Sequence, residues 1–274
     1  MSSFQNKTFF ITGASRGIGK AIALKLAASG ANIIIASKST EENPKLGGTI
    51  YTAAEEIEKA GGKALAVPCD IRDEAMIINA DQQGIEKFGG IDGVINNASA
   101  ISLTNTVQTE TKRFDLMYDI NVRGTFLVTK HCVPFLLKSS NPHILTLSPP
   151  LNMNPKWFGP HVAYSISKYN MSMLTMGWAA EFKEAGIAAN TLWPLTTIAT
   201  SAVNNLLGGD YLMKRSRNTE ILADAAFYIL QQDARAYTEK HLLDEDVLKE
   251  AGITDFDRYA ITPGGPLQKD LFID

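Results

Sequence analysis

The fold is decided near the amino terminus by residues 8–19, which read TFFITGASRGIG. Residues 7–12 form a largely apolar run that predicts a buried strand, and the glycines after it have the spacing G-x-x-x-G-x-G. Ile18, Ile22 and Leu26 then recur at helical spacing. A glycine turn between a strand and a helix presents backbone N–H groups at the amino end of the helix, where they can hold a pyrophosphate. We therefore predict a dinucleotide site at this turn, with an ordinary strand–helix connection as the alternative.

The rest of the chain alternates strands and helices in the same way. Further strands are predicted over residues 31–36, 64–67, 91–95, 143–147 and 187–193, and helices over about residues 49–60, 73–88, 112–137 and 162–184. Strands joined by helical crossovers imply a parallel sheet with helices on both faces. We expect an α/β Rossmann fold, a doubly wound parallel sheet, in a single domain over residues 1–274 with its core at about 6–243. Residues 244–274 form a C-terminal extension, which either packs against a neighbouring subunit or covers the site.

Composition and charge exclude several classes of partner and location. Of the 274 residues, 45% are apolar and 20% are charged, which is ordinary for a globular protein. The 26 basic residues are not clustered and 29 acidic ones balance them, so we expect no nucleic-acid partner. Cys69 and Cys132 lack metal-ligand spacing, so we expect no metal. We find no signal peptide, no apolar run of about 18 residues and no carboxyl-terminal peroxisomal tripeptide, which favours a cytoplasmic protein without a membrane span.

Four motifs in order along the chain make it similar to the short-chain dehydrogenase/reductase family. They are the turn T-G-x3-G-x-G at residues 12–19, the triplet Asn96-Asn97-Ala98, Asn121, and the Tyr-x3-Lys pattern of Tyr164 and Lys168. The resemblance covers about residues 6–240. Within the family, residues 48–57 and 147–152 resemble the hydroxysteroid dehydrogenase-like group, whose members can carry a sterol-carrier-like domain after the dehydrogenase. We expect no such domain in this chain.

The resemblance implies a nicotinamide dinucleotide cofactor that lies across the carboxyl ends of the strands. Its contacts are expected from the glycine turn, from the ends of four strands and from the helix over residues 162–184. The residues expected to bind it are Gly13, Ser15, Arg16, Gly17, Ile18, Gly19, Ser37, Lys38, Asp70, Ile71, Asn97, Ala98, Tyr164, Lys168, Pro194, Thr196 and Thr197. By resemblance, Asp70 and Ile71 flank the adenine, and the segment that begins at Pro194 contacts the nicotinamide carboxamide.

Charge at the end of the second strand bears on the choice between NADP(H) and NAD(H). A carboxylate there would accept hydrogen bonds from the ribose 2′-hydroxyl and repel a 2′-phosphate, but none occurs before Glu41. Ser37 and Lys38 stand there instead, and Arg16 lies in the phosphate turn, where a guanidinium can bind phosphate. These residues favour NADP(H). NAD(H) remains the alternative, in which Arg16 and Lys38 are solvated surface charges.

The spacing of Tyr164 and Lys168 suits proton transfer. A tyrosine has a pKa of about 10, which is too high for a base near neutral pH. Lys168 lies one helical turn after Tyr164, so its ammonium group can stabilise the phenolate and lower that pKa. We therefore assign Tyr164 as the catalytic acid and base. The resemblance implies that Lys168 also binds the nicotinamide ribose and that Asn121 helps to hold a water in the proton relay.

The chain departs from the family at the catalytic serine. Pro149 occupies the position that usually carries it, and a proline has no hydrogen to donate to a carbonyl oxygen. Ser148 is therefore a candidate catalytic residue, with Asn152 and Asn154 as alternative donors. A missing donor of this kind typically costs about 10²–10³ in rate. The alternative function is accordingly a cofactor-binding homologue with weak or no catalysis, such as a sensor or scaffold; a lyase or epimerase on the same fold is a further alternative.

The substrate is expected to be an apolar small molecule. Trp157 and Phe158 precede the catalytic helix and are candidates for lining an apolar pocket, and residues 206–218, with Gly208 and Gly209, lie where the family has its substrate lid. The prediction is an NADP(H)-dependent oxidoreductase that interconverts a secondary alcohol and a carbonyl, lipid- or steroid-like by resemblance. The resemblance also implies a homo-oligomer, a dimer or tetramer, assembled through the helices over residues 112–137 and 162–184.

Overall fold

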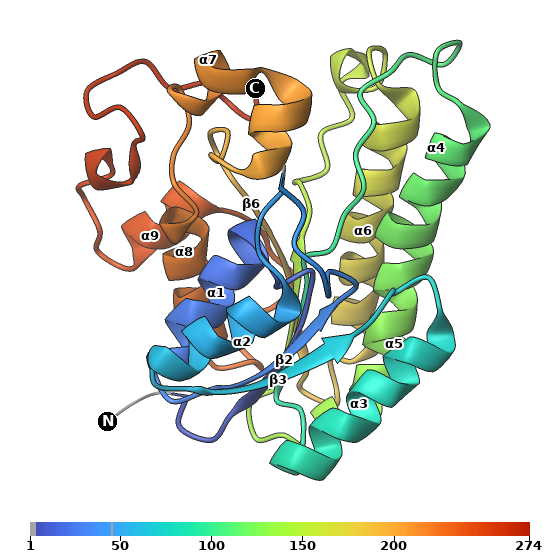
Figure 1. Cartoon of the computed structure of the whole chain (residues 1–274), viewed down its shortest axis with the longest axis vertical. Helices are drawn as coiled ribbons and strands as arrows, with labels where there is room; N and C mark the ends of the chain where they lie inside the picture. Colours follow the sequence, from blue (N-terminus) through green and yellow to red (C-terminus); the bar gives the residue numbers. More distant parts are fainter. Residues whose placement is uncertain (1–3, 45) are drawn as a thin grey trace.

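Seven parallel strands form one sheet in the computed structural model, which describes residues 4–44 and 46–274 (Figure 1). Their order across the sheet is β3-β2-β1-β4-β5-β6-β7. The strands are β1 Thr8–Thr12, β2 Asn32–Ser37, β3 Lys63–Pro68, β4 Gly93–Asn96, β5 His143–Leu147, β6 Ala188–Trp193 and β7 His241–Leu243. The order reverses between β1 and β4, and this topological switch point is where ligands bind in such sheets. The predicted single-domain Rossmann fold is thus confirmed.

Helices cover both faces of the sheet, as Figure 1 shows. On one face lie α1 Gly17–Ala27, α2 Ile50–Lys59, α8 Glu220–Gln231 and α9 Asp244–Glu250. On the other lie α3 Glu74–Phe88, α4 Thr111–Met117, α5 Thr125–Leu136 and α6 Val162–Glu181. The short helix α7 Gly209–Met213 stands above the sheet. Short helical segments of other types cover Tyr118–Gly124, Pro155–Trp157, Val203–Leu207 and Asp257–Tyr259.

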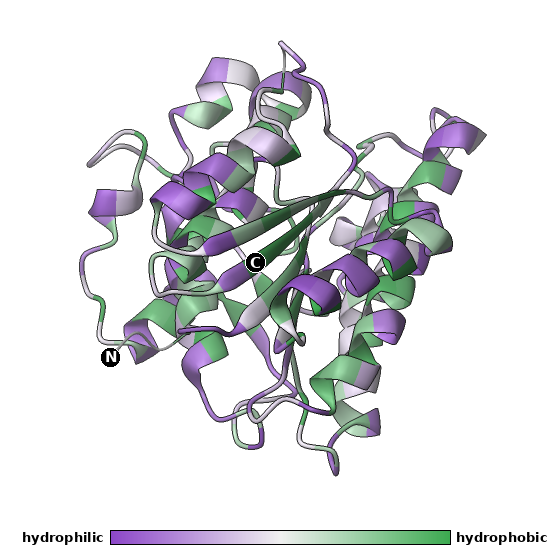
Figure 2. Cartoon of the chain, turned by 60° about the horizontal axis from the view of Figure 1, so that its bottom comes forward, coloured by the Kyte–Doolittle hydropathy of each residue, from purple (hydrophilic) through white to green (hydrophobic). Residues whose placement is uncertain are grey.

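The strands are apolar on both faces because each face packs on helices. Ile33 and Ile35 of β2 belong to the core under α1 and α8, while Ile34 between them belongs to the core under α3 and α5. In a strand, successive side chains point to opposite faces, so a run of isoleucines supplies both cores. Figure 2 shows the consequence: the strands are hydrophobic between helices whose outer surfaces are hydrophilic. Burying each isoleucine is worth about 1.5–3 kcal/mol.

The helix expected over residues 112–137 is divided into three. The π-helical segment Tyr118–Gly124 separates α4 from α5, and Asn121 lies in its middle. A π-helical turn contains an extra residue, so it changes which side chains face the sheet, and such turns occur often at functional sites. Periodicity alone does not reveal it, since α4 and α5 each keep an α-helical pattern.

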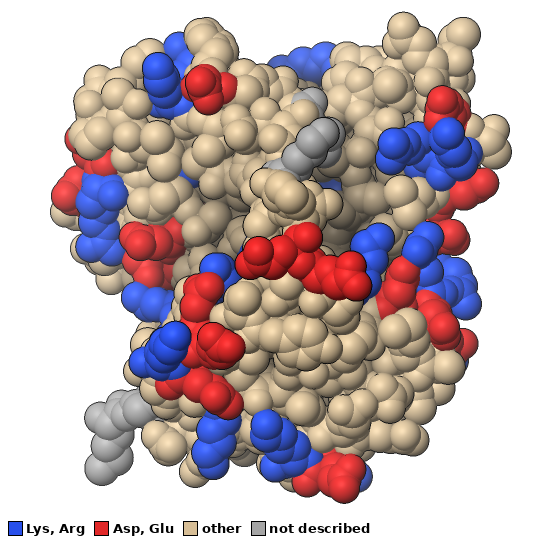
Figure 3. All heavy atoms as spheres, in the orientation of Figure 1, with Lys and Arg blue, Asp and Glu red and all other residues tan. Residues whose placement is uncertain are grey.

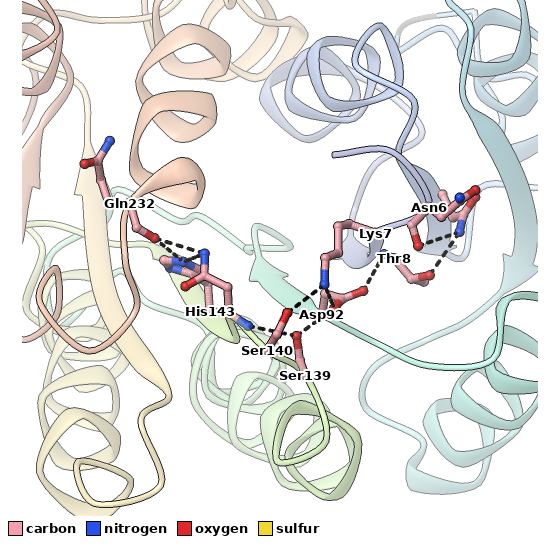
Figure 4. A network of polar contacts seen from close by, with 10 residues as sticks. Asn6, Lys7, Thr8, Asp92, Ser139, Ser140, His143 and Gln232 are labelled. Atoms are coloured by element: carbon pink, nitrogen blue, oxygen red, sulfur yellow. Dashed lines mark hydrogen bonds and ion pairs between the residues drawn. The ribbon is translucent and has the colours of Figure 1, made fainter. Parts of the chain in front are cut away.

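A polar network ties the amino ends of three strands together (Figure 4). Asp92, before β4, forms an ion pair with Lys7 at 2.9 Å and accepts hydrogen bonds from Thr8 N at 2.9 Å and Ser139 Oγ at 2.6 Å. His143 of β5 lies 3.1 Å from the carbonyl oxygen of Gln232 through its Nε2. The network thus links the amino ends of the strands, and two large cavities lie at the opposite, carboxyl ends.

The surface carries both signs of charge. On the face seen in Figure 3, Lys and Arg side chains alternate with Asp and Glu. Across residues 4–44 and 46–274, no helix is both long enough and apolar enough to cross a bilayer. Within the same residues, His, Cys, Asp and Glu side chains form no group of three or more that would hold a metal ion.

Candidate active site

The glycine turn after β1 is held tightly against the end of β4. Gly13 and Gly17 have φ of 66° and 57°, a backbone region that favours glycine. Asn97 Nδ2 donates to the carbonyl oxygens of Thr12 and Gly13 at 2.9 and 3.2 Å. A Cβ atom on Gly19 would lie 2.5 Å from Asn97 Nδ2, so the first turn of α1 approaches this amide as closely as a glycine allows. The turn thus forms a cradle into which backbone N–H groups of the α1 amino end point.

A cavity of about 510 Å³ lies over this cradle. It is lined by most of the residues expected to bind the cofactor: Gly13, Ser15, Arg16, Gly17, Ile18, Ser37, Lys38, Asp70, Ile71, Asn97 and Ala98. Gly19 lies behind the wall, against Asn97. The shape and the glycine cradle fit the adenosine and pyrophosphate part of a dinucleotide.

Arg16 holds a neighbouring loop over the cradle. Its Nε and a terminal nitrogen donate to the carbonyl oxygens of Gly47 and Gly48 at 2.7 and 2.9 Å. A Cβ on Gly48 would lie 2.7 Å from the carbonyl oxygen of Ser15, so the loop passes very close to the turn. The guanidinium therefore shapes the wall of the cavity, and its remaining nitrogen donors are available to an anion there.

The two charged candidates at the strand ends differ in environment. Lys38 is exposed on the cavity wall, at the end of β2. The carboxylate of Asp70 is bound by the Arg72 guanidinium, with 2.9 Å from Nε to Oδ1 and 2.5 Å from a terminal nitrogen to Oδ2. This hydrogen bonding, together with the charge of Lys38, lowers the pKa of Asp70. Lys38 therefore presents an accessible positive charge at the cavity wall, whereas the negative charge of Asp70 is paired with Arg72.

A second cavity, of about 440 Å³, continues from the first. The two share Ile18, Asn97 and Thr200, so they form one channel along the carboxyl ends of the strands. It is lined by four residues expected to bind the cofactor: Tyr164, Lys168, Pro194 and Thr197. Most of the rest of its wall is apolar, with side chains such as Ile101, Leu103, Val203, Leu207 and Leu212. Val203, Leu207 and Leu212 come from the segment expected to form a lid and from the residues just before it. The tyrosine and lysine thus lie at the end of the channel that begins at the glycine cradle.

Tyr164 and Lys168 are buried side by side on α6. Their exposed fractions are 5% and 2%. Burial raises the pKa of Tyr164 above its usual value, and the charge of Asp270 adds to this rise. Burial also lowers the pKa of Lys168 to about 7, against the opposing charge of Asp270. Lys168 Nζ donates to the carbonyl oxygen of Leu147 at 2.7 Å and lies 5.0 Å from the centre of the Trp193 ring.

Asn121 is committed to contacts within the protein. Its Oδ1 accepts from Ala100 N at 2.8 Å, and its Nδ2 donates to the carbonyl oxygen of Ala100 at 2.9 Å and to Ser167 Oγ at 3.0 Å. The amide therefore joins the π-helical segment to the loop after β4 and to α6. It is fully buried and does not line either cavity. Its place in a water relay stays a prediction.

Ser148 is also fully buried and lies off the walls of both cavities. Its Oγ has no hydrogen-bond partner in the part of the chain that the structure describes. The alternative donors, Asn152 and Asn154, also lie off the walls of both cavities. Asn152 Nδ2 donates to Asp274 at 2.8 Å, and Asn154 Oδ1 accepts from Lys156 N at 3.1 Å. A donor for the substrate oxygen in place of the usual serine is therefore not identified among these three residues.

The loop after β6 meets the end of the chain. Thr196 is buried and pairs with Lys269 in an antiparallel bridge, and Thr197 N donates to the carbonyl oxygen of Gln268 at 2.9 Å. Residues 268–271 line the second cavity. The C-terminal extension thus covers the site, which is one of the two arrangements that the sequence left open. Sequence patterns did not predict these four residues; the one signal was the apolar pair at 271–272, at the end of a polar stretch.

Trp157 packs against that extension and Phe158 packs against Tyr169 of α6, and neither residue lines either cavity, contrary to the expectation from the sequence. The ring centre of Trp157 lies 6.0 Å from that of Phe272, and Phe158 lies 5.2 Å from Tyr169. These aromatic residues form a cluster beside Tyr164. The cluster supports the wall of the second cavity from outside.

Comparison with known proteins agrees with this geometry. The family described as short chain dehydrogenase matches residues 7–207. Over 267 residues, 97% of the chain, it is 58% identical to hydroxysteroid dehydrogenase-like protein 2 of Danio rerio, and it spans 64% of that protein. A putative dehydrogenase from Xanthomonas campestris is 50% identical, with a TM-score of 0.96 over 99% of both chains. A short chain dehydrogenase from Mycobacterium thermoresistibile is 52% identical, with a TM-score of 0.94 over 98% of this chain and 96% of the other.

Proposed function

Because the chain belongs to the short-chain dehydrogenase family, we propose that it is an NADP(H)-dependent oxidoreductase that interconverts a secondary alcohol and a carbonyl. The observation that carries this proposal is the channel that runs from the glycine cradle to Tyr164 and Lys168. A nicotinamide dinucleotide extended along the channel would reach from the cradle to these two side chains, with Pro194 and Thr197 beside its nicotinamide end. Pyrophosphate binding at a helix amino end and proton transfer at a tyrosine are then provided by one continuous site.

The residues of the chain would perform the proton step. The bound cofactor supplies or accepts the hydride. In reduction, Tyr164 donates its phenolic proton to the carbonyl oxygen, and in oxidation its phenolate accepts the proton of the alcohol. The ammonium group of Lys168, four residues further along α6, stabilises the phenolate. Since burial raises the pKa of Tyr164, the free site favours the protonated tyrosine, which is the form that reduction requires.

Preference for NADP(H) rests on the charge around the first cavity. Arg16 and Lys38 both line it, and β2 ends in Ser37 without a carboxylate. A 2′-phosphate at the end of β2 would meet the exposed Lys38 and the remaining donors of Arg16. NAD(H) lacks the 2′-phosphate and would not gain this contact. Because two carbonyl contacts already occupy Arg16, we expect Lys38 to contribute more to this preference.

The walls of the second cavity support an apolar substrate. Its lining comes from the β4 loop, α6, the β6 loop, the lid segment and residues 268–271, and most of these side chains are apolar. Lipid- or steroid-like alcohols and ketones match such a wall. The alternative function, cofactor binding with weak or no catalysis, is favoured by the position of Ser148 away from the cavity.

Fluorescence titration with NADPH and, separately, NADH tests the proposal, followed by turnover of a panel of apolar ketones. We expect saturable binding that is tighter for NADPH, and oxidation of NADPH with at least one ketone. The Lys38→Asp variant should shift the preference toward NADH by about tenfold, which corresponds to about 1.4 kcal/mol. Binding without turnover would favour the alternative function, and binding of neither cofactor would contradict both. An unchanged preference in Lys38→Asp would remove the role given to this lysine.

A further inference from the structure

The C-terminal segment 268–274 crosses the end of the sheet and closes one side of the second cavity. Asp270 N donates to the carbonyl oxygen of Leu195 at 3.1 Å, and Trp193 Nε1 donates to the carbonyl oxygen of Leu271 at 3.0 Å. These bonds hold the segment along the loop after β6. Figure 1 shows the end of the chain beside α7, on the side of the sheet where α7 stands. As a result, side chains from the last residues of the chain become part of the wall around Tyr164.

Phe272 anchors this segment. It is 2% exposed, and its ring centre lies 5.0 Å from that of Tyr169 and 6.2 Å from that of Tyr164. Its φ of 73° is rare for a residue with a bulky side chain, so the surrounding packing must hold it. Beyond it, the carboxylate of Asp274 binds Lys156 at 2.6 Å. The segment is therefore held both before Phe272, by its backbone bonds to the β6 loop, and after it, by the ion pair of Asp274.

Asp270 brings a carboxyl group to this wall. It lines the second cavity together with Tyr164 and Lys168, and its Oδ1 accepts from Leu271 N at 2.6 Å. The ionisable groups that face it are Lys168 and Tyr164 from α6, and Asp244 from the start of α9. Burial and the charge of Asp244 raise the pKa of Asp270 to about 7, whereas the charge of Lys168 opposes this rise. The adjacent cation, Lys269, donates instead to the main-chain oxygen of Asp274.

The surroundings of Lys168 explain why a carboxylate matters there. Its nitrogen contacts the carbonyl oxygen of Leu147 at 2.7 Å and Met171 Sδ at 3.3 Å, and it lies over Trp193. Among the described residues, no acidic side chain forms an ion pair with it. A buried ammonium group with neutral neighbours tends to lose its proton, and a nearby negative charge favours keeping it.

We propose that Asp270 is a positioning residue of the active site: it is the counter-ion that keeps Lys168 charged within a mostly apolar cavity. It acts across the cavity and not through direct contact, since the lysine nitrogen is bound to Leu147. The consequence for catalysis rests on the proposed function, because a charged Lys168 is what stabilises the Tyr164 phenolate. The proton on Lys168 itself does not depend on turnover.

Nuclear magnetic resonance of the full chain labelled with 13Cε-lysine tests this inference in the absence of cofactor. The Lys168 signal is assigned by its loss in Lys168→Arg, and its position is followed against pH. In Asp270→Asn we expect the titration midpoint of Lys168 to fall by about one pH unit or more, because the stabilising charge is gone. Asp270→Glu should keep the midpoint near that of the unchanged protein. The control is Asp255→Asn, an exposed carboxylate of the same extension, which should leave the midpoint unchanged.

Phe272→Ala is a second variant, which releases the segment while Asp270 stays intact. Releasing the segment removes both the carboxylate and part of the burial from the cavity, and burial lowers the pKa of Lys168, so the midpoint in Phe272→Ala should lie above that in Asp270→Asn. A lower midpoint in Asp270→Asn than in the unchanged protein supports the inference. A midpoint that does not fall in folded Asp270→Asn would overturn it. Near-ultraviolet circular dichroism verifies the fold of each variant. Absence of ketone turnover would contradict the proposed function and leave these midpoints as they are, so the two failures are distinguishable.

Discussion

At the scale of single residues, burial of an ionisable side chain is useful at Lys168 and costs stability at Asp81. At the site it brings the pKa of Lys168 to about 7, so that neighbouring charges can control this lysine near neutral pH. In the α3–α5 interface it isolates Asp81, which is 3% exposed and whose Oδ1 lies 3.6 Å from Cys132 Sγ. Its Oδ2 has no hydrogen-bond partner among the described residues. Lys168 can thus serve the chemistry of the site, whereas Asp81 lowers the stability of the fold whenever it is charged.

The Tyr164→Phe variant should lose catalysis and keep the fold. Removing a positioned proton donor typically costs about 10²–10⁴ in rate. We expect kcat for ketone reduction to fall by about this factor, while NADPH affinity changes less than about threefold. Steady-state kinetics and fluorescence titration measure the two quantities. Tyr51→Phe, at a side chain that is 51% exposed on α2, is the matched control. Turnover of Tyr164→Phe within a few-fold of the unchanged protein would show that the acid and base assignment is wrong.

The Asp81→Asn variant should change how stability depends on pH. Burial raises the pKa of Asp81 to about 7 in the folded protein, against about 3.9 when unfolded. The folded state therefore binds the proton more tightly, so this group's contribution to the free energy of unfolding is greatest below about pH 4 and falls as pH rises toward 7. At pH 8 we expect Asp81→Asn to be more stable by about 2–4 kcal/mol, since one pKa unit is worth about 1.4 kcal/mol.

Urea unfolding of both proteins at pH 5 and pH 8 checks this expectation. The gain should be smaller at pH 5 than at pH 8. Glu86→Gln, an exposed carboxylate on the same helix, should show no such difference. An Asp81→Asn protein that is less stable at pH 8 would mean that the charged carboxylate has a favourable partner.

At the scale of elements, the site depends on how closely α1 approaches the end of β4. The contact is between Gly19 and the Asn97 amide, whose Nδ2 also bonds the carbonyl oxygens of Thr12 and Gly13. One side chain thus holds the strand, the turn and the helix in register. The backbone of the turn depends on glycine at two further positions, because Gly13 and Gly17 have positive φ.

Gly19→Ala should therefore weaken cofactor binding through this contact. The added Cβ would lie 2.5 Å from Asn97 Nδ2 and 2.9 Å from the carbonyl oxygen of Gly13, so the turn must open. We expect the Kd for NADPH to rise more than about tenfold. Gly177→Ala in α6, where a Cβ meets nothing within 4 Å, is the control and should bind as before, with a stability gain of about 0.5–1 kcal/mol from helix propensity. Unchanged affinity in Gly19→Ala would mean that the cradle is not the pyrophosphate site.

At the scale of the whole molecule, the amino and carboxyl ends of the strands have different roles. The Lys7–Asp92 network closes the amino edge, and the channel opens at the carboxyl edge. One outer surface remains unusual. Helices α4, α5 and α6 expose large apolar side chains, each between 38% and 51% exposed: Phe114, Phe126, Ile166, Met173 and Met176. We propose that this surface is the interface of a homodimer or homotetramer, since exposed apolar patches commonly mark protein interfaces.

Light scattering coupled to size-exclusion chromatography tests the assembly. We expect a mass at least twice the 29.8 kDa of one chain. The double variant Phe126→Glu, Met173→Glu should reduce it toward a single chain, because charge at an apolar interface is costly to bury. Val107→Glu, at a loop side chain that is 95% exposed, is the control. A single-chain mass for the unchanged protein would contradict the proposed interface.

Local patterns predicted the fold and part of the lining of the first cavity. The run at residues 7–12, the glycine spacing after it and the recurring isoleucines placed β1, the turn and α1 within a residue or two. The residues expected to bind the cofactor in the first cavity follow from that order, because the carboxyl ends of parallel strands meet at one edge. The three-residue strand β7 has no such signal, since it is short and only half-buried at the edge of the sheet.

The sequence by itself determined the order of the first six strands and of the helices between them, the glycine cradle and the pairing of Tyr164 with Lys168. Each of these depends on residues close together in the chain, where spacing sets geometry. Only the tertiary structure decided that Ser148 lies away from the cavity and that Asn121 is occupied by Ala100. It also decided that Asp270 lines the same cavity as Lys168, more than one hundred residues earlier in the chain. These outcomes depend on packing between segments distant in sequence, and no local spacing encodes which buried polar groups then find partners.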